Sequence, residues 1–184
     1  MEMNKRETKV TWLDVILALL AGTVIVAGIL CIAQTIWSGY HFLDDHELFR
    51  IEQSANQGQP LLTTVKAWIL NDLRVRYRPL YWTERVTVGY LFGSNLTAWN
   101  IWTAVKGVFA FALLYLTARF LKNTRLISFV FPMIIMLGAQ FTPWYRSANQ
   151  ESTGLLLCSA ILCLITAQYN PVSYTHLRAH ETRG

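Results

Sequence analysis

Four apolar stretches separated by polar segments dominate the pattern of this 184-residue sequence. The first runs from about Trp12 to Trp37. Beyond Asp14 it holds no charged side chain for more than the roughly 20 residues that a membrane-spanning helix requires. The others lie at about residues 96–121, 126–141 and 155–167. The pattern predicts an all-α, polytopic membrane protein with about four transmembrane helices.

The last two stretches are short for full spans, but neighbouring aromatic residues can extend them at the membrane surface. Thr142-Pro-Trp-Tyr145 follows one stretch, and Gln168-Tyr169 follows the other. The first stretch ends in Gln34-Thr-Ile-Trp37 and lacks the small residues of a signal-peptide cleavage site. We therefore expect it to be a retained anchor.

The long polar region at 38–95 contains a helix of a different kind. Its apolar residues recur at helical spacing, and its polar residues fall largely on the other side of the helical wheel. The apolar positions are Leu61, Leu62, Val65, Trp68, Ile69 and Leu73. We expect an amphipathic helix whose apolar face rests on the membrane surface or against the transmembrane helices.

Composition agrees with a membrane protein, because 53% of the residues are hydrophobic and only 15% are charged. The net charge of +5 would suggest nucleic acid in a soluble protein. Here the basic residues lie beside apolar stretches, so membrane lipids are the expected partners and nucleic acid is not. Cys31, Cys158 and Cys163 all lie in apolar stretches, which argues against a disulfide framework and a metal cluster.

The distribution of basic residues predicts the orientation in the membrane. Lys5, Arg6 and Lys9 precede the first span, and Arg119, Lys122 and Arg125 lie between the second and third. Basic residues collect on the cytoplasmic side, so the N-terminus is expected there and residues 38–95 outside. Lys106 lies roughly two turns inside the second span, and we expect its side chain to extend to the outer membrane surface.

An aspartate pair, Asp44 and Asp45, follows the first span within the string His41-Phe-Leu-Asp-Asp-His-Glu47. In one interpretation, Asp44 caps a helix and Glu47 completes a capping box, which leaves Asp45 unexplained. In the other, a desolvated carboxylate with a raised pKa acts as a general base. His46 and Glu47 are candidate ligands of a divalent cation, although their spacing matches no specific coordination signature.

A second candidate segment is Arg74-Val-Arg-Tyr-Arg-Pro-Leu-Tyr-Trp82. If it is extended, its alternating arginines lie on one side. The segment then forms an interfacial belt on lipid headgroups, or Arg76, Arg78 and Tyr81 bind a phosphate or pyrophosphate. Between the third and fourth spans, Arg146 and Glu151 are expected on the same outer face, either as an ion pair or as a second wall of a site.

The end of the chain breaks abruptly from the membrane pattern. Residues 171–184 resemble translated adapter or vector sequence, so we expect natural sequence to stop near Asn170 and the real protein to continue. His176 and His180, followed by Glu181, then imitate a zinc motif by accident.

The ordered set of motifs resembles the N-terminal part of GT-C superfamily glycosyltransferases, closest to the protein mannosyltransferase and aminoarabinose transferase group. The matching strings are Phe42-Leu-Asp-Asp-His-Glu-Leu48, Arg76-Tyr-Arg-Pro-Leu-Tyr-Trp82 and Trp144-Tyr-Arg146 with Glu151. The resemblance implies inverting transfer of a sugar from a polyprenyl-phosphate donor to an acceptor at the outer membrane surface. It gives the role of catalytic base to Asp44 or Asp45, and metal use varies within the superfamily.

Full-length members have many more spans and often a C-terminal outer domain, so this chain alone is expected to be inactive. The alternative is a noncatalytic small membrane protein, either a transporter fragment or a partner-binding subunit. In that case the aspartate pair only caps a helix.

Overall fold

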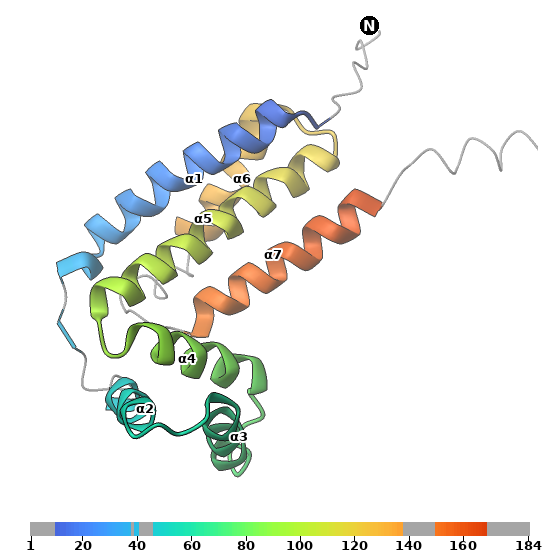
Figure 1. Ribbon diagram of the computed structural model, residues 1–184. Helices are drawn as coiled ribbons and strands as arrows, with labels where there is room; N and C mark the ends of the chain where they lie inside the picture. The colour runs from blue at the N-terminus through green and yellow to red at the C-terminus, as the bar shows by residue number, and fades with distance from the viewer. Residues whose placement is uncertain (1–9, 38, 41–45, 138–149, 169–184) are drawn as a thin grey trace, which may run out of the picture.

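The computed structural model describes residues 10–37, 39–40, 46–137 and 150–168, and within these ranges all regular structure is helical (Figure 1). The helices are α1 (Trp12–Ile32), the short 3-10 helix η1 (Thr35–Trp37), α2 (His46–Asn56), α3 (Leu61–Asp72), α4 (Pro79–Phe92), α5 (Leu96–Phe120), α6 (Arg125–Leu137) and α7 (Gln150–Gln168). The prediction of an all-α protein is confirmed.

Three of these helices, α1, α5 and α7, are long and apolar enough to cross a membrane. They agree with the first, second and fourth predicted spans, although α7 begins at Gln150 rather than near residue 155. The third predicted span corresponds to α6, which is apolar but has only 13 residues in the described part of the chain.

Helix α5 is the centre of the bundle, because α1, α6 and α7 all pack against it (Figure 1). Asn100, near the start of α5, donates to the carbonyl oxygen of Thr35 after the end of α1. At the other end, Tyr115 donates to Asp14 in the first turn of α1, so α1 and α5 are antiparallel. Phe111 is fully buried between them and lies 5.8 Å from the ring of Phe129 on α6.

Small residues allow α1 to approach α5 closely. Ala18 and Gly22 are one turn apart on α1, and both are buried. A Cβ atom added to Gly22 would lie 3.2 Å from the carbonyl oxygen of Val108 and 3.3 Å from the Cβ of Phe111. Close backbone approach through small residues is typical of helix pairs in membranes, where lipid supplies no hydrophobic force between helices.

Helices α2, α3 and α4 form a second layer across one end of the bundle (Figure 1). Ile51, Val65 and Val86, one from each helix, form its core. The amphipathic helix predicted at 61–73 is therefore present as α3, but its apolar face packs on α2 and α4. Leu62 and Leu73 of this face remain 80% and 52% exposed, so the expectation that the face rests on the membrane stays a prediction.

Helix α4 covers only the last part of the segment at 74–82, and the three alternating arginines precede it. The chain turns at 73–75, and the helix begins at Pro79, which occupies the first turn where its missing N–H leaves no helical bond unmade. Helix α4 ends before Gly93, whose φ of 60° favours glycine. The three arginines at 74, 76 and 78 therefore do not lie on one side of a strand.

Candidate functional site

Four side chains at the start of α4 carry polar contacts to the surrounding helices. They are Arg78, Tyr81, Glu84 and Arg85, and we call them the α4 site. Residues three and four apart on a helix share a face, which places Arg78, Tyr81 and Arg85 near one another. Their partners come from α2, α3, α5 and α7, so the α4 site lies where the second layer meets the bundle (Figure 1).

Arg78 joins the end of α3 to the start of α7. Its Nε and Nη2 atoms each donate to one carboxylate oxygen of Asp72 at 2.9 Å, and its Nη1 donates to the side-chain oxygen of Gln150 at 2.7 Å. This forked geometry is among the strongest that arginine makes with a carboxylate. The hydrogen bonds from Arg78 hold the pKa of Asp72 below its ordinary value, and the same bonds raise the pKa of Arg78.

Aromatic rings pack around the two arginines of the α4 site. The guanidinium carbon of Arg78 lies 4.9 Å from the centre of the Tyr81 ring, and that of Arg85 lies 5.5 Å from it. Trp82 stacks on Trp68 of α3 with ring centres 4.7 Å apart. Cations over aromatic faces are favourable, so Tyr81 holds the two guanidiniums close together.

Arg85 ties α4 to the start of α2. Its Nε lies 3.1 Å from a carboxylate oxygen of Glu47, and its side chain is only 3% exposed. Glu47 is the residue expected to complete a capping box with Asp44, which lies outside the described residues, so that interpretation stays a prediction. Because Glu47 is two residues after Asp45 in the sequence, this ion pair fixes the helix that directly follows the aspartate pair.

Glu84 connects α4 to two membrane-spanning helices. One of its carboxylate oxygens accepts from Trp102 Nε1 at 2.7 Å and from Lys106 Nζ at 2.6 Å. The other accepts from the Thr153 hydroxyl of α7, and Lys106 also donates to this hydroxyl at 2.9 Å. Lys106 is 3% exposed. The expectation that it reaches the outer surface is wrong, since it has a buried carboxylate partner.

The remaining predicted residues lie in several places. Asp44, Asp45 and Arg146 fall outside the described residues. Arg76 is exposed, and its backbone N–H donates to the Asp72 carbonyl. Glu151 is exposed in the first turn of α7, beside Gln150.

The candidate metal ligands His46 and Glu47 lie in the first turn of α2, where His46 is exposed. Within the described ranges, no group of three or more histidine, cysteine or acidic residues is placed to hold a metal ion.

Sequence reasoning missed several residues of this region: Glu84, Arg85, Gln150, Thr153 and Trp102. One signal was present. Proline is common in the first turn of a helix and glycine just after its end, as Pro79 and Gly93 are here. A helix between them would have placed Arg78, Tyr81 and Arg85 on one face. No sequence signal indicates that Glu84 meets Lys106, because that contact depends on how three helices pack.

Comparisons of the chain with protein-family models, with curated proteins and with solved structures each found no match.

Proposed function

We propose that this chain is the N-terminal part of a GT-C-type membrane glycosyltransferase, which transfers a sugar from a polyprenyl-phosphate donor to an acceptor at the outer face of the membrane. One observation carries the proposal beyond the sequence motifs. The α4 site brings Glu47 of the first matching string together with Arg78 and Tyr81 of the second, and Arg78 also bonds Gln150, which precedes Glu151 in the sequence.

In this proposal α6 belongs to the third of four spans, and the N-terminus is cytoplasmic in a bacterial plasma membrane. Helices α2–α4 and the start of α7 then lie on the outer side, within the cell envelope. Three described helices are long enough to span, and the α4 site lies at the first turn of one of them. A lipid-linked donor held in the outer leaflet would present its phosphate at this depth.

Asp44 or Asp45 acts as the catalytic base that removes a proton from the acceptor hydroxyl as it attacks the anomeric carbon. A positioned base typically contributes about 10² to 10⁴ in rate. Both sides of residues 41–45 are fixed. On one side the Tyr40 hydroxyl donates to the Ser94 carbonyl at 2.6 Å, and on the other Glu47 pairs with Arg85. These contacts hold the described residues that flank the pair in the sequence.

The donor phosphate leaves as the glycosidic bond breaks, and it needs positive charge nearby. All three nitrogens of Arg78 already donate to Asp72 or Gln150. Arg76 is exposed, so it is the arginine better placed to receive the phosphate. Arg78 acts as a positioning residue that holds the start of α4 against α7, with Tyr81 packed beneath its guanidinium.

The test uses the complete open reading frame, recovered by sequencing the source DNA across residues 170–184. Transfer from a polyprenyl-phosphate sugar is measured for the parent protein and for Asp44→Asn and Asp45→Asn. We expect one of the two variants to lose at least about a hundredfold in rate. Glu52→Gln is the control and should retain activity, because Glu52 lies on the same outer layer but belongs to none of the three matching strings.

Two results would contradict the proposal. If the reading frame truly stops after Gly184, the chain is too small for this machinery. If a longer parent transfers sugar equally well with both aspartates changed, the pair has no catalytic role. The first result favours the noncatalytic membrane protein, and the second leaves an enzyme whose catalytic base lies elsewhere.

A further inference from the structure

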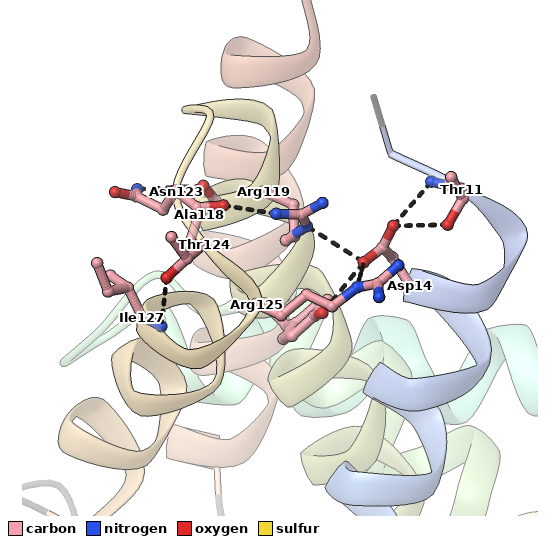
Figure 2. A network of polar contacts seen from close by, with 9 residues as sticks. Thr11, Asp14, Ala118, Arg119, Asn123, Thr124, Arg125 and Ile127 are labelled. Atoms are coloured by element: carbon pink, nitrogen blue, oxygen red, sulfur yellow. Dashed lines mark hydrogen bonds and ion pairs between the residues drawn. The ribbon is translucent and has the colours of Figure 1, made fainter. Parts of the chain in front are cut away.

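A cluster of charged side chains lies at the end of the bundle opposite to α2–α4. Its centre is Asp14, which is fully buried in the first turn of α1 (Figure 2). One carboxylate oxygen accepts from the backbone N–H and the hydroxyl of Thr11, at 2.9 and 2.7 Å. The other lies 3.2 Å from Arg119 Nε and 3.0 Å from Arg125 Nε, and it accepts from the Tyr115 hydroxyl at 3.3 Å.

The cluster carries more positive than negative charge. Among the described residues, two guanidiniums meet one carboxylate here, which leaves one positive charge without a counter-charge. Arg119 is buried, with its side chain 4% exposed, and its Nη1 donates to the carbonyl oxygen of Asn123 at 2.5 Å. The Arg125 side chain is 52% exposed, and within the described part of the chain its hydrogen bond to Asp14 is made through Nε and not through either Nη atom.

Figure 2 shows how the two arginines are held. They come from the end of α5 and the start of α6, and both point toward the Asp14 carboxylate. The Asp14 carboxylate contacts the Nε atom of each guanidinium. The edge of the Arg125 guanidinium that carries its two Nη atoms is not used in this contact. A guanidinium fixed by a carboxylate along one edge can still donate a pair of N–H groups along another.

The cluster lies at the depth of lipid headgroups. Trp12, the first residue of α1, is 83% exposed, as expected of an aromatic residue at a membrane interface. Helix α1 begins here and α5 ends here, and both are candidate spans. The abundant anion at this depth is the lipid phosphate, whose geometry matches the forked donors of arginine.

We propose that Arg125, held by Asp14 beside the buried Arg119, binds the phosphodiester group of an anionic membrane lipid at this end of the bundle. The lipid phosphate accepts N–H groups from the Nη edge of Arg125, and its single negative charge balances the surplus positive charge of the cluster. Asp14 orients the guanidiniums before the lipid binds. The site is separate from the α4 site and does not depend on glycosyl transfer.

Native mass spectrometry of the purified 184-residue chain, titrated with phosphatidylglycerol in detergent micelles, tests the site. Phosphatidylcholine carries the same phosphodiester with a compensating positive charge, and we expect it to bind less tightly. Arg125→Gln should weaken phosphatidylglycerol binding by about tenfold or more, since a charge-assisted pair is lost. Arg125→Lys keeps the charge but not the fork, and it should restore only part of the affinity.

Lys122→Gln is the matched control, because Lys122 is an exposed cation three residues away that does not contact Asp14. Its phosphatidylglycerol affinity should stay within about twofold of the original. Equal binding of the two lipids, or equal loss in the Arg125 and Lys122 variants, would overturn the proposal. Inorganic phosphate competing as strongly as the lipid would assign the cluster to a soluble anion instead.

Discussion

Glu84 and Lys106 form an ion pair of 2.6 Å that joins α4 to the membrane-spanning helix α5. Both side chains are largely buried, and Thr153 of α7 completes the group. In a bilayer, an unpaired charge at this position would be strongly unfavourable. The pair therefore gives the outer layer of helices a fixed position on the bundle.

Removing one partner of this pair should be more harmful than removing both. Lys106→Met leaves Glu84 buried without its cation, and we expect a loss of about 3 kcal/mol in the free energy of unfolding. The double variant Glu84→Gln with Lys106→Met removes both charges of the pair, so neither is left without its partner. It should therefore be more stable than Lys106→Met alone. Unfolding in detergent measures both, with the exposed Lys66→Met as the control. Equal stability of Lys106→Met and the original protein would contradict the role of the pair.

The Asp72–Arg78 pair should make stability fall in acid. The pKa of Asp72 is lowered below its ordinary value of 3.8 by the hydrogen bonds from Arg78. A carboxyl group with a lowered folded-state pKa contributes stability that is fully present above the unfolded-state pKa, and this stability is lost as the pH falls through the folded-state pKa. The melting temperature should therefore decline below about pH 4.

Asp72→Asn isolates this contribution, because asparagine does not titrate. The difference in melting temperature between the original protein and Asp72→Asn should be constant near neutral pH and shrink as the pH drops below about 4. A difference that stays constant down to pH 2 would show that Asp72 is not coupled to folding.

Gly89 is needed where α4 crosses α2. A Cβ atom added there would lie 2.6 Å from the Cγ2 of the buried Ile51, which is too close for two carbon atoms. Gly89→Ala should therefore destabilise the outer layer by about 1–3 kcal/mol.

Gly154→Ala on α7 is the matched control, since nothing lies within 4 Å of its added Cβ. Alanine forms helices better than glycine, so this variant should be neutral or more stable. Thermal unfolding and limited proteolysis of residues 46–92 would compare the two variants. Similar behaviour of both would show that α2 and α4 are not in close contact.

Arg76 and Arg78 should respond differently to neutralisation. Arg76→Gln should leave stability within about 0.5 kcal/mol, because the side chain is exposed. In the proposed glycosyltransferase, it should weaken binding of a polyprenyl phosphate by about tenfold. Arg78→Gln should lower the melting temperature, since Asp72 and Gln150 lose their partner. The reverse pattern, with Arg76 structural and Arg78 dispensable, would contradict this assignment of roles.

The long apolar helices could be predicted because the bilayer sets a minimum length for an uncharged segment. That requirement is visible in α1 without knowledge of its neighbours. The amphipathic pattern of α3 was equally visible, but its covering partner was not, since Val65 would be buried equally by lipid or by α4. Periodicity predicts which side of a helix is apolar, but it does not predict whether lipid or another helix covers that side.

The contacts of the α4 site could not be predicted, because they join residues far apart in the sequence. The alternating arginines at 74–78 would lie on one side only if the segment were extended. In the structure α4 begins at Pro79, and Arg78 just before it bonds Asp72 and Gln150. Lys106 was recognised as an unusual charge, but its partner depends on the register of α4 against α5. The aspartate pair, the strongest sequence signal, stays a prediction.

The α4 site also constrains the order in which the chain assembles during synthesis. Arg78 cannot bond Gln150, nor Glu84 bond Thr153, until the ribosome has added 72 and 69 further residues, respectively. Until Thr153 has been added, Lys106 has Glu84 of α4 but not the Thr153 hydroxyl as a hydrogen-bond partner. Insertion of α7 is then the step that adds the Gln150 and Thr153 contacts between α7 and the outer layer.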